Sequence, residues 1–197
     1  MTIKLPFANY SAWQQITFCA ALLERMLPNY QMFSEAENFG EYKILRNQLD
    51  LIWQWLDKKS QCKINYSAQL IKLEDQTPNP EHFDSFGVFP ALDVCMALMS
   101  LLQAMEDQDE DNIINVGRLS QNSVSFYIEL LLENENETDE ACSDDQIDNH
   151  PLMQWERATQ NELFDFLKDA PENKTTCLAA KALVLEEGLS NLGIEIA

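Results

Sequence analysis

The chain has 197 residues, 46% of them hydrophobic and including ten Phe and four Trp, which is enough to build the core of one domain. Its formal net charge is −20, and nearly all of the imbalance lies in residues 73–156, where 20 Asp and Glu accompany one basic residue, Arg118. We therefore expect no direct binding of nucleic acid and no attachment to anionic membranes, because both require clustered Lys and Arg.

The N-terminal residues, MTIKLPFANYSAWQQ, lack the apolar run and the cleavage site of a signal peptide. The longest apolar stretch, residues 91–102, is interrupted by Asp93 and Ser100 and is shorter than the about 20 residues that span a bilayer. The five cysteines are widely spread and form no C-x-x-C pair. These features predict a cytoplasmic protein without a membrane-spanning segment.

Apolar residues at helical spacing predict the first three helices. Residues 13–26 place their apolar side chains on one helix face, and Pro28 is expected to end that helix. Residues 42–56 repeat the spacing. A shorter helix over residues 67–75 stops before the sequence T-P-N-P.

The middle of the chain predicts two further helices and a loop. Residues 87–105 form the most apolar helical stretch, and Pro90 suits its first turn. Residues 113–131 again show helical spacing. Residues 133–148 contain eight acidic and no basic residues, so we expect a solvated, flexible acidic loop or a frayed helix end.

The last part of the chain predicts two more helices. One begins at residues 149–151, Asn-His-Pro. Residues 169–172, Asp-Ala-Pro-Glu, resemble the N-cap and first turn of the other, which the apolar spacing extends to a stop at Gly193. With about seven helices and no strong β pattern, the predicted fold class is all-α, a single-domain multi-helix bundle over residues 1–197.

No motif in the chain specifies a reaction. The five glycines form no phosphate-binding loop, and His82 and His150, the only histidines, fall outside metal-binding patterns. Cys142 and His150 are close in sequence, but neighbouring carboxylates are expected to raise the pKa of the thiol and to make it a poor nucleophile. We therefore predict no catalytic residues, no cofactor and no metal ligands, and lean towards a protein that is not an enzyme.

Asp93 is the most interesting ionisable residue, because it lies within the most apolar helix. The favoured interpretation is structural, since a negative charge near a helix N-terminus is stabilising. The alternative is a pocket between helices, lined by Asp84, Phe86, Phe89 and Asp93, that binds a small ligand or supports catalysis.

The leading functional hypothesis is a non-catalytic protein that docks a basic patch of a partner protein through its acidic residues. Self-association through the near-neutral ends of the chain stays open. The candidate docking surface consists of Glu106, Asp107, Asp109, Glu110, Asp111, Glu133, Glu135, Glu137, Asp139, Glu140, Asp144, Asp145 and Asp148.

Four segments carry a resemblance to a known family: residues 24–33 (ERMLPNYQMF), 49–53 (LDLIW), 83–95 (FDSFGVFPALDVC) and 190–194 (SNLGI). In these segments the chain resembles the YjaG-like family, small bacterial proteins classed as a domain of unknown function. The likeness runs from about residue 10 to residue 196. It implies a cytoplasmic, all-helical single domain, and it implies no activity, substrate or catalytic residue.

Overall fold

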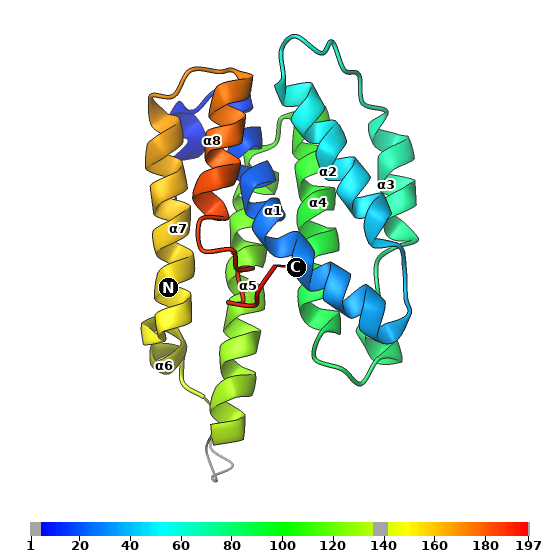
Figure 1. The fold of residues 1–197 in the computed structure, drawn as a ribbon, viewed down its shortest axis with the longest axis vertical. Helices are drawn as coiled ribbons and strands as arrows, with labels where there is room; N and C mark the ends of the chain where they lie inside the picture. The colour runs from blue at the N-terminus through cyan, green and yellow to red at the C-terminus, as the bar shows by residue number, and fades with distance from the viewer. Residues whose placement is uncertain (1–4, 136–141, 197) are drawn as a thin grey trace.

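The computed structural model describes residues 5–135 and 142–196, and within these ranges it contains eight α-helices, two short 3-10 helices and no strand (Figure 1). The predicted all-α fold is confirmed. The elements are η1 (Phe7–Asn9), α1 (Ala12–Glu37), α2 (Tyr42–Leu56), α3 (Tyr66–Glu74), η2 (Pro80–His82), α4 (Val88–Asp107), α5 (Glu110–Glu135), α6 (Asp144–Asn149), α7 (Pro151–Lys168) and α8 (Lys174–Val184).

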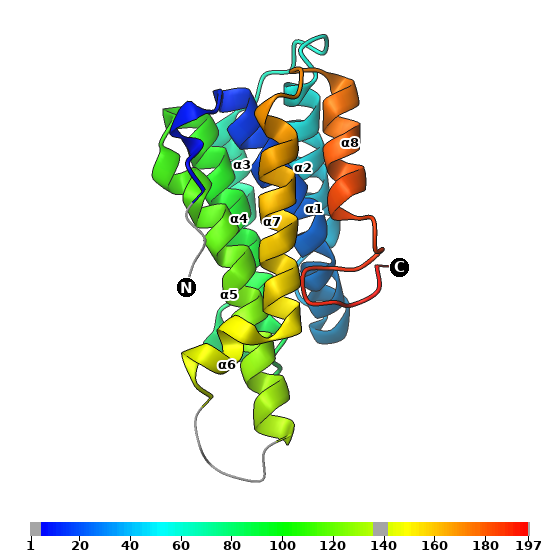
Figure 2. The ribbon, with the colours of Figure 1, turned by 90° about the vertical axis from the view of Figure 1, so that its left-hand side faces the viewer.

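Helix α1 is the centre of the fold, because α2, α4, α5, α7 and α8 all pack against it. It is buried along most of its length, so it carries apolar residues around nearly its whole circumference. Helices α4 and α5 form an antiparallel pair behind it, with α7 beside α5 (Figures 1 and 2). The main core is shared by these helices and by α2 and α8.

The prediction that Pro28 ends the first helix is wrong, because α1 continues to Glu37. A proline inside a helix removes one N–H and loosens the ladder of carbonyl groups in the preceding turn. In that turn the Arg25 carbonyl accepts a hydrogen bond from the backbone N–H of Asn191, at 3.2 Å. The C-terminal part of the chain therefore stabilises α1 where the proline weakens it, and the buried packing carries the helix past this point.

The predicted start of the last helix is also wrong. Its N-cap is Asn173, whose side chain accepts from the backbone N–H of Thr176 at 3.1 Å. Glu172, predicted as a first-turn residue, instead accepts hydrogen bonds from Ser11 and Lys58. The acidic side chain is therefore used in long-range contacts, and the asparagine one position later provides the cap.

The last helix ends at Val184, well before the predicted stop at Gly193. Gly188, with a φ of +66°, allows the chain to turn back. Residues 185–196, which we call the C-terminal segment, then form a turn closed by a hydrogen bond from Ser190 N–H to the Ile194 carbonyl, at 2.8 Å. Figure 1 shows this segment in red beside α1 and α5.

Residues 133–148, predicted as an acidic loop or a frayed helix end, are helical at both ends of this range, and the expectation of a loop is corrected there. Helix α5 continues to Glu135, and α6 begins at Asp144. Ser143 and Gln146 form a capping box at the start of α6, and the buried side chain of Ile147 attaches it to the core. Residues 136–141 of the predicted loop lie outside the described residues.

Helix α4 is long and apolar enough to cross a membrane by length and composition, whereas the sequence suggested a shorter apolar stretch. Its most apolar window is 72% buried inside the protein. Among the described residues, burial against α1, α3 and α5 accounts for the composition of this helix.

Candidate functional site

A buried ion pair lies at the centre of the molecule. Arg25 and Glu156 contact each other with side chains only 1% and 0% exposed. Glu156 also accepts hydrogen bonds from Ser120 Oγ at 2.6 Å and from Gln160 Nε2 at 2.7 Å. The Arg25 guanidinium stacks on the Trp155 ring, 3.8 Å from its centroid. Burial lowers the pKa of Arg25, and the charge of Glu156 opposes that shift.

Asn191 connects the C-terminal segment to this network. Its Nδ2 donates to the carbonyl and to the Oγ of Ser120, each at 3.1 Å. Its Oδ1 accepts from Asn29 Nδ2 at 2.7 Å. The Ser120 carbonyl can only accept a hydrogen bond, so Asn191 must direct its Nδ2 towards it. The Oδ1 of Asn191 then faces Asn29, which must donate through its own Nδ2. The Oδ1 of Asn29 is the end of this chain of hydrogen bonds, and it is buried without a partner.

Asn29 lines a cavity of about 300 Å³ between α1, the start of α4, α5 and the C-terminal segment. We call it the Asn29 cavity. Most of its wall is apolar or aromatic, with Phe33 from α1, Phe86 from the loop before α4, Tyr127 from α5 and Leu192 from the C-terminal segment. Its size and composition are typical of a site for a small molecule.

Few polar groups line the Asn29 cavity. Besides Asn29, the wall includes Ser85, whose Oγ is also buried without a hydrogen-bond partner. Within the described part of the chain, Glu37 is the only charged residue of the lining. Both unpaired oxygens have practically no accessible surface, so the wall that faces the cavity is almost entirely apolar.

Of the four residues of the predicted pocket, the structure brings together Phe86 and Phe89, whose ring centroids lie 6.3 Å apart, but not the two aspartates. Phe86 lines the Asn29 cavity, but Asp84 is exposed on the preceding loop. Phe89 is 41% exposed and packs with Phe126, the two ring centroids lying 5.6 Å apart. Asp93 faces α5, away from the cavity lining. Of the four predicted pocket residues, only Phe86 lines the Asn29 cavity.

Asp93 lies in the second turn of α4, so the expected role at the helix N-terminus, which acts over the first turn, does not explain its position. Its carboxylate accepts from Ser123 Oγ at 2.8 Å and from Asn122 Nδ2 at 3.1 Å. Burial raises the pKa of Asp93 to about 6, although these hydrogen bonds oppose the shift. The residue joins α4 to α5.

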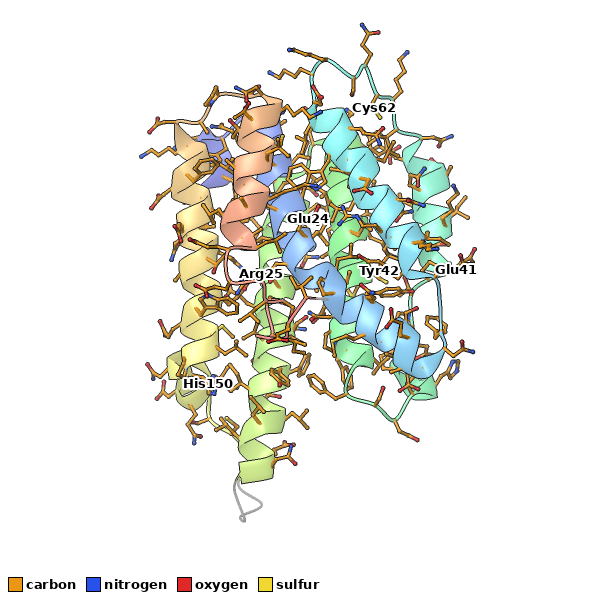
Figure 3. The ribbon with its side chains drawn as sticks, in the orientation of Figure 1. Glu24, Arg25, Glu41, Tyr42, Cys62 and His150 are labelled. Atoms are coloured by element: carbon orange, nitrogen blue, oxygen red, sulfur yellow. The ribbon has the colours of Figure 1, made fainter. Side chains whose placement is uncertain are left out.

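A second buried charged cluster surrounds Glu24, which sequence reasoning missed. Arg46 donates two hydrogen bonds to its carboxylate, at 2.6 and 2.9 Å, and Trp53 Nε1 and Lys181 Nζ donate at 2.7 and 2.9 Å. Burial alone would raise the pKa of Glu24, but Arg46 and Lys181 more than offset it and the pKa is lowered. Glu24 and Arg25 are neighbours on α1 (Figure 3). In the sequence, the adjacent charged residues Glu24 and Arg25 within the apolar run of α1 indicate both buried clusters.

The acidic residues of the predicted docking surface form two groups. Residues 106–111 surround the turn between α4 and α5, whereas Glu133, Asp144 and Asp145 lie at the other end of α5, near α6 (Figure 2). At 1.5 Å per residue, the helix separates the groups by roughly 33 Å. Asp148 pairs with Arg157. The candidates Glu137, Asp139 and Glu140 lie outside the described residues. Docking of a basic protein stays a prediction, and each group would need its own basic patch.

Cys142 and His150 do not form a nucleophile and a base. The Nδ1 of His150 accepts from the backbone N–H of Leu152, at 3.2 Å, and caps α7 (Figure 3). Slight burial, followed by the charges of Glu129, Glu133 and Asp144, raises the pKa of the Cys142 thiol. Within the described ranges, no three His, Cys, Asp or Glu side chains gather as metal ligands.

Comparison with known proteins gives one consistent family. Residues 3–195 match the family model "Protein of unknown function (DUF416)". The chain is 34% identical to the uncharacterized protein YjaG of Escherichia coli strain K12 over 194 residues, 98% of this chain and 95% of the relative. It is 36% identical to an uncharacterized protein of Haemophilus influenzae over 195 residues, 95% of this chain and 93% of the relative.

A solved structure shares the fold. The crystal structure of a DUF416 family protein from Shewanella baltica OS155 is similar with a TM-score of 0.84 and 33% sequence identity. The similarity covers 98% of this chain and 100% of that one.

Proposed function

The chain belongs to the DUF416 family of proteins of unknown function, and we propose that it binds a small, largely apolar molecule in the Asn29 cavity. The observation that carries the proposal is the cavity of about 300 Å³ itself, whose wall consists almost entirely of apolar and aromatic side chains. An apolar cavity of this size provides affinity for a small molecule with a hydrocarbon body.

The position of the family resemblance supports the same site. Three of the four segments on which the resemblance rests, residues 24–33, 83–95 and 190–194, each contribute to the wall of the Asn29 cavity. They are far apart in the chain and meet only in the folded protein. The long-range hydrogen bond between Asn29 and Asn191 fixes two of them together.

We propose binding rather than catalysis because of the state of the serine in the wall. A serine becomes a nucleophile when a neighbouring base accepts its proton. The Oγ of Ser85 has no hydrogen-bond partner, so no base activates it.

The proposal is tested by filling the cavity. Ala36 lines the Asn29 cavity at an exposed position of α1, and Ala36→Trp adds a large side chain there without disturbing the core. Ala158, an exposed alanine of α7 outside the described cavities, provides the control Ala158→Trp. We expect indole to shift the amide NMR signals of the cavity residues in the wild type and in Ala158→Trp, and not in Ala36→Trp. Identical shifts in all three proteins would contradict the proposal.

A further inference from the structure

We infer, on the basis of the proposed function, that the molecule held in the Asn29 cavity is an apolar organic ammonium ion, that is, a primary amine attached to a hydrocarbon body. The inference comes from three features of the wall: its lack of accessible polar atoms, its aromatic rings and the sign of the charge at its edge.

The first feature is that the wall offers almost no polar atom to a ligand. The unpaired oxygens Asn29 Oδ1 and Ser85 Oγ are buried with practically no accessible surface, so a molecule in the cavity does not reach them. A hydrocarbon body therefore fills the cavity, and the polar group of the ligand lies at its edge beside Glu37. A carboxylate only accepts hydrogen bonds, and an ammonium group brings three hydrogens, whereas a second carboxylate brings none.

The second feature is the aromatic wall. The side chains of Phe33, Phe86 and Tyr127 line the cavity, and aromatic faces attract cations. Elsewhere the same fold already places cations on rings, with Arg25 over Trp155 at 3.8 Å and Lys181 Nζ 4.5 Å from the Trp53 centroid. The ammonium group of such a ligand can interact with the aromatic rings, and its hydrocarbon body can pack against the apolar side chains.

The third feature is the sign of the charge. Among the residues that the structure describes, Glu37 is the only charged one in the lining, and none of the lining residues is Lys or Arg. The whole chain carries a net charge of −20, which attracts cations and repels anions. On α1, Glu37 lies eight residues after Asn29, about 12 Å along the helix. The carboxylate therefore lies at one side of the cavity and favours the entry of a positively charged ligand over a carboxylate.

The test compares three probes with the same six-carbon body: hexylamine, hexan-1-ol and hexanoate. Their affinities are measured by calorimetry near pH 7, where the amine is protonated, in about 150 mM NaCl to screen attraction to the acidic surface. We expect hexylamine to bind about fivefold more tightly than hexan-1-ol, and hexanoate to bind most weakly.

Variants of the protein test whether the preference for hexylamine over hexan-1-ol arises in the Asn29 cavity. Glu37→Gln should weaken hexylamine binding about fivefold and leave hexan-1-ol unchanged. Glu35→Gln, which removes an exposed carboxylate of α1 outside the lining, should change neither. Ala36→Trp should abolish binding of both probes, and hexylamine binding that survives it would be surface attraction and would overturn the inference.

The remaining outcomes separate this inference from the proposed function. If hexan-1-ol or hexanoate binds as tightly as hexylamine and Ala36→Trp blocks it, the cavity is a binding site and the ammonium class is wrong. If none of the three probes nor indole binds, the proposed function itself fails.

Discussion

At the scale of single residues, the core of this protein is unusually polar where the C-terminal segment meets α1 and α5. Asn29, Ser120 and Asn191 are all buried, and each uses its donor within the network or towards Glu156. Burying such groups is unfavourable unless they are paired. The unpaired Oδ1 of Asn29 therefore stands out, because its neighbours are satisfied.

Asp93 provides a prediction at this scale. Its folded pKa of about 6 lies above the ordinary value of 3.8, so the folded protein binds this proton more tightly than the unfolded chain does. The stability that Asp93 provides is greatest below about pH 4 and falls as the pH rises to about 6. Asp93→Asn has no proton to lose. Relative to wild type, its free energy of unfolding should rise between pH 4 and pH 7, by up to about 3 kcal/mol.

Urea denaturation at the two pH values measures this effect. If the difference in the free energy of unfolding between Asp93→Asn and wild type is the same at pH 4 and pH 7, the carboxyl group of Asp93 does not titrate as its burial requires.

At the scale of elements, the sequence predicted most helices because one apolar stripe per helix is a local signal. The stripe of α2, residues 42–56, appears at the predicted residues, and α4, α5 and α7 begin and end close to where the spacing placed them. The prediction failed at Pro28, at both ends of α8 and within residues 133–148, where α6 begins. At these places the outcome depends on contacts distant in the chain, such as that between Arg25 and Asn191, which local periodicity does not contain.

The candidate site was predictable only in part, for the same reason. The aromatic loop before α4 was identified, and Phe86 does line the Asn29 cavity. In the sequence, Asn29 and Asn191 are isolated asparagines that do not indicate a site. Their relation is seen only in the fold, where Asn29 Nδ2 lies 2.7 Å from Asn191 Oδ1. The grouping of Asp84 with Asp93 failed because residues nine apart on a loop and a helix need not face the same side.

The C-terminal segment gives a prediction at this scale. Asn191→Ala leaves Asn29 Nδ2 buried and unpaired, and it removes the hydrogen bonds that Asn191 donates to Ser120. We expect the free energy of unfolding to fall by about 2–4 kcal/mol, measured by chemical denaturation. Asn134→Ala is the control, because Asn134 is exposed and bonds only within α5. Its effect should stay within about 0.5 kcal/mol. Equal effects of the two substitutions would mean that the segment contributes little to stability.

At the scale of the whole molecule, the charge is distributed unevenly. The central helix α1 uses Glu24 and Arg25 in buried pairs, whereas the acids of residues 106–111 and those near α6 are exposed at opposite ends of α5. Exposed like charges repel one another and destabilise the compact state, and salt screens that repulsion.

The charge distribution predicts a salt dependence of stability. Raising NaCl from about 20 to about 200 mM should raise the midpoint of thermal unfolding by about 3 °C. A variant with Asp109→Asn, Glu110→Gln and Asp111→Asn should show a smaller rise, and so should a variant with Asp144→Asn and Asp145→Asn. Calorimetry of the three proteins at both salt concentrations measures the effect. A midpoint that does not change with salt in the wild type would refute this view of the surface.

The most direct test of the central claim is to determine where a small molecule lies when it is bound. We would record intermolecular NOEs between hexylamine and the isotope-labelled protein. The account predicts NOEs from the hydrocarbon chain to Phe33, Phe86 and Leu192, with none to the acidic residues at the ends of α5. NOEs confined to those acidic ends, or no NOE to the cavity at saturating hexylamine, would contradict the claim that the Asn29 cavity is a binding site.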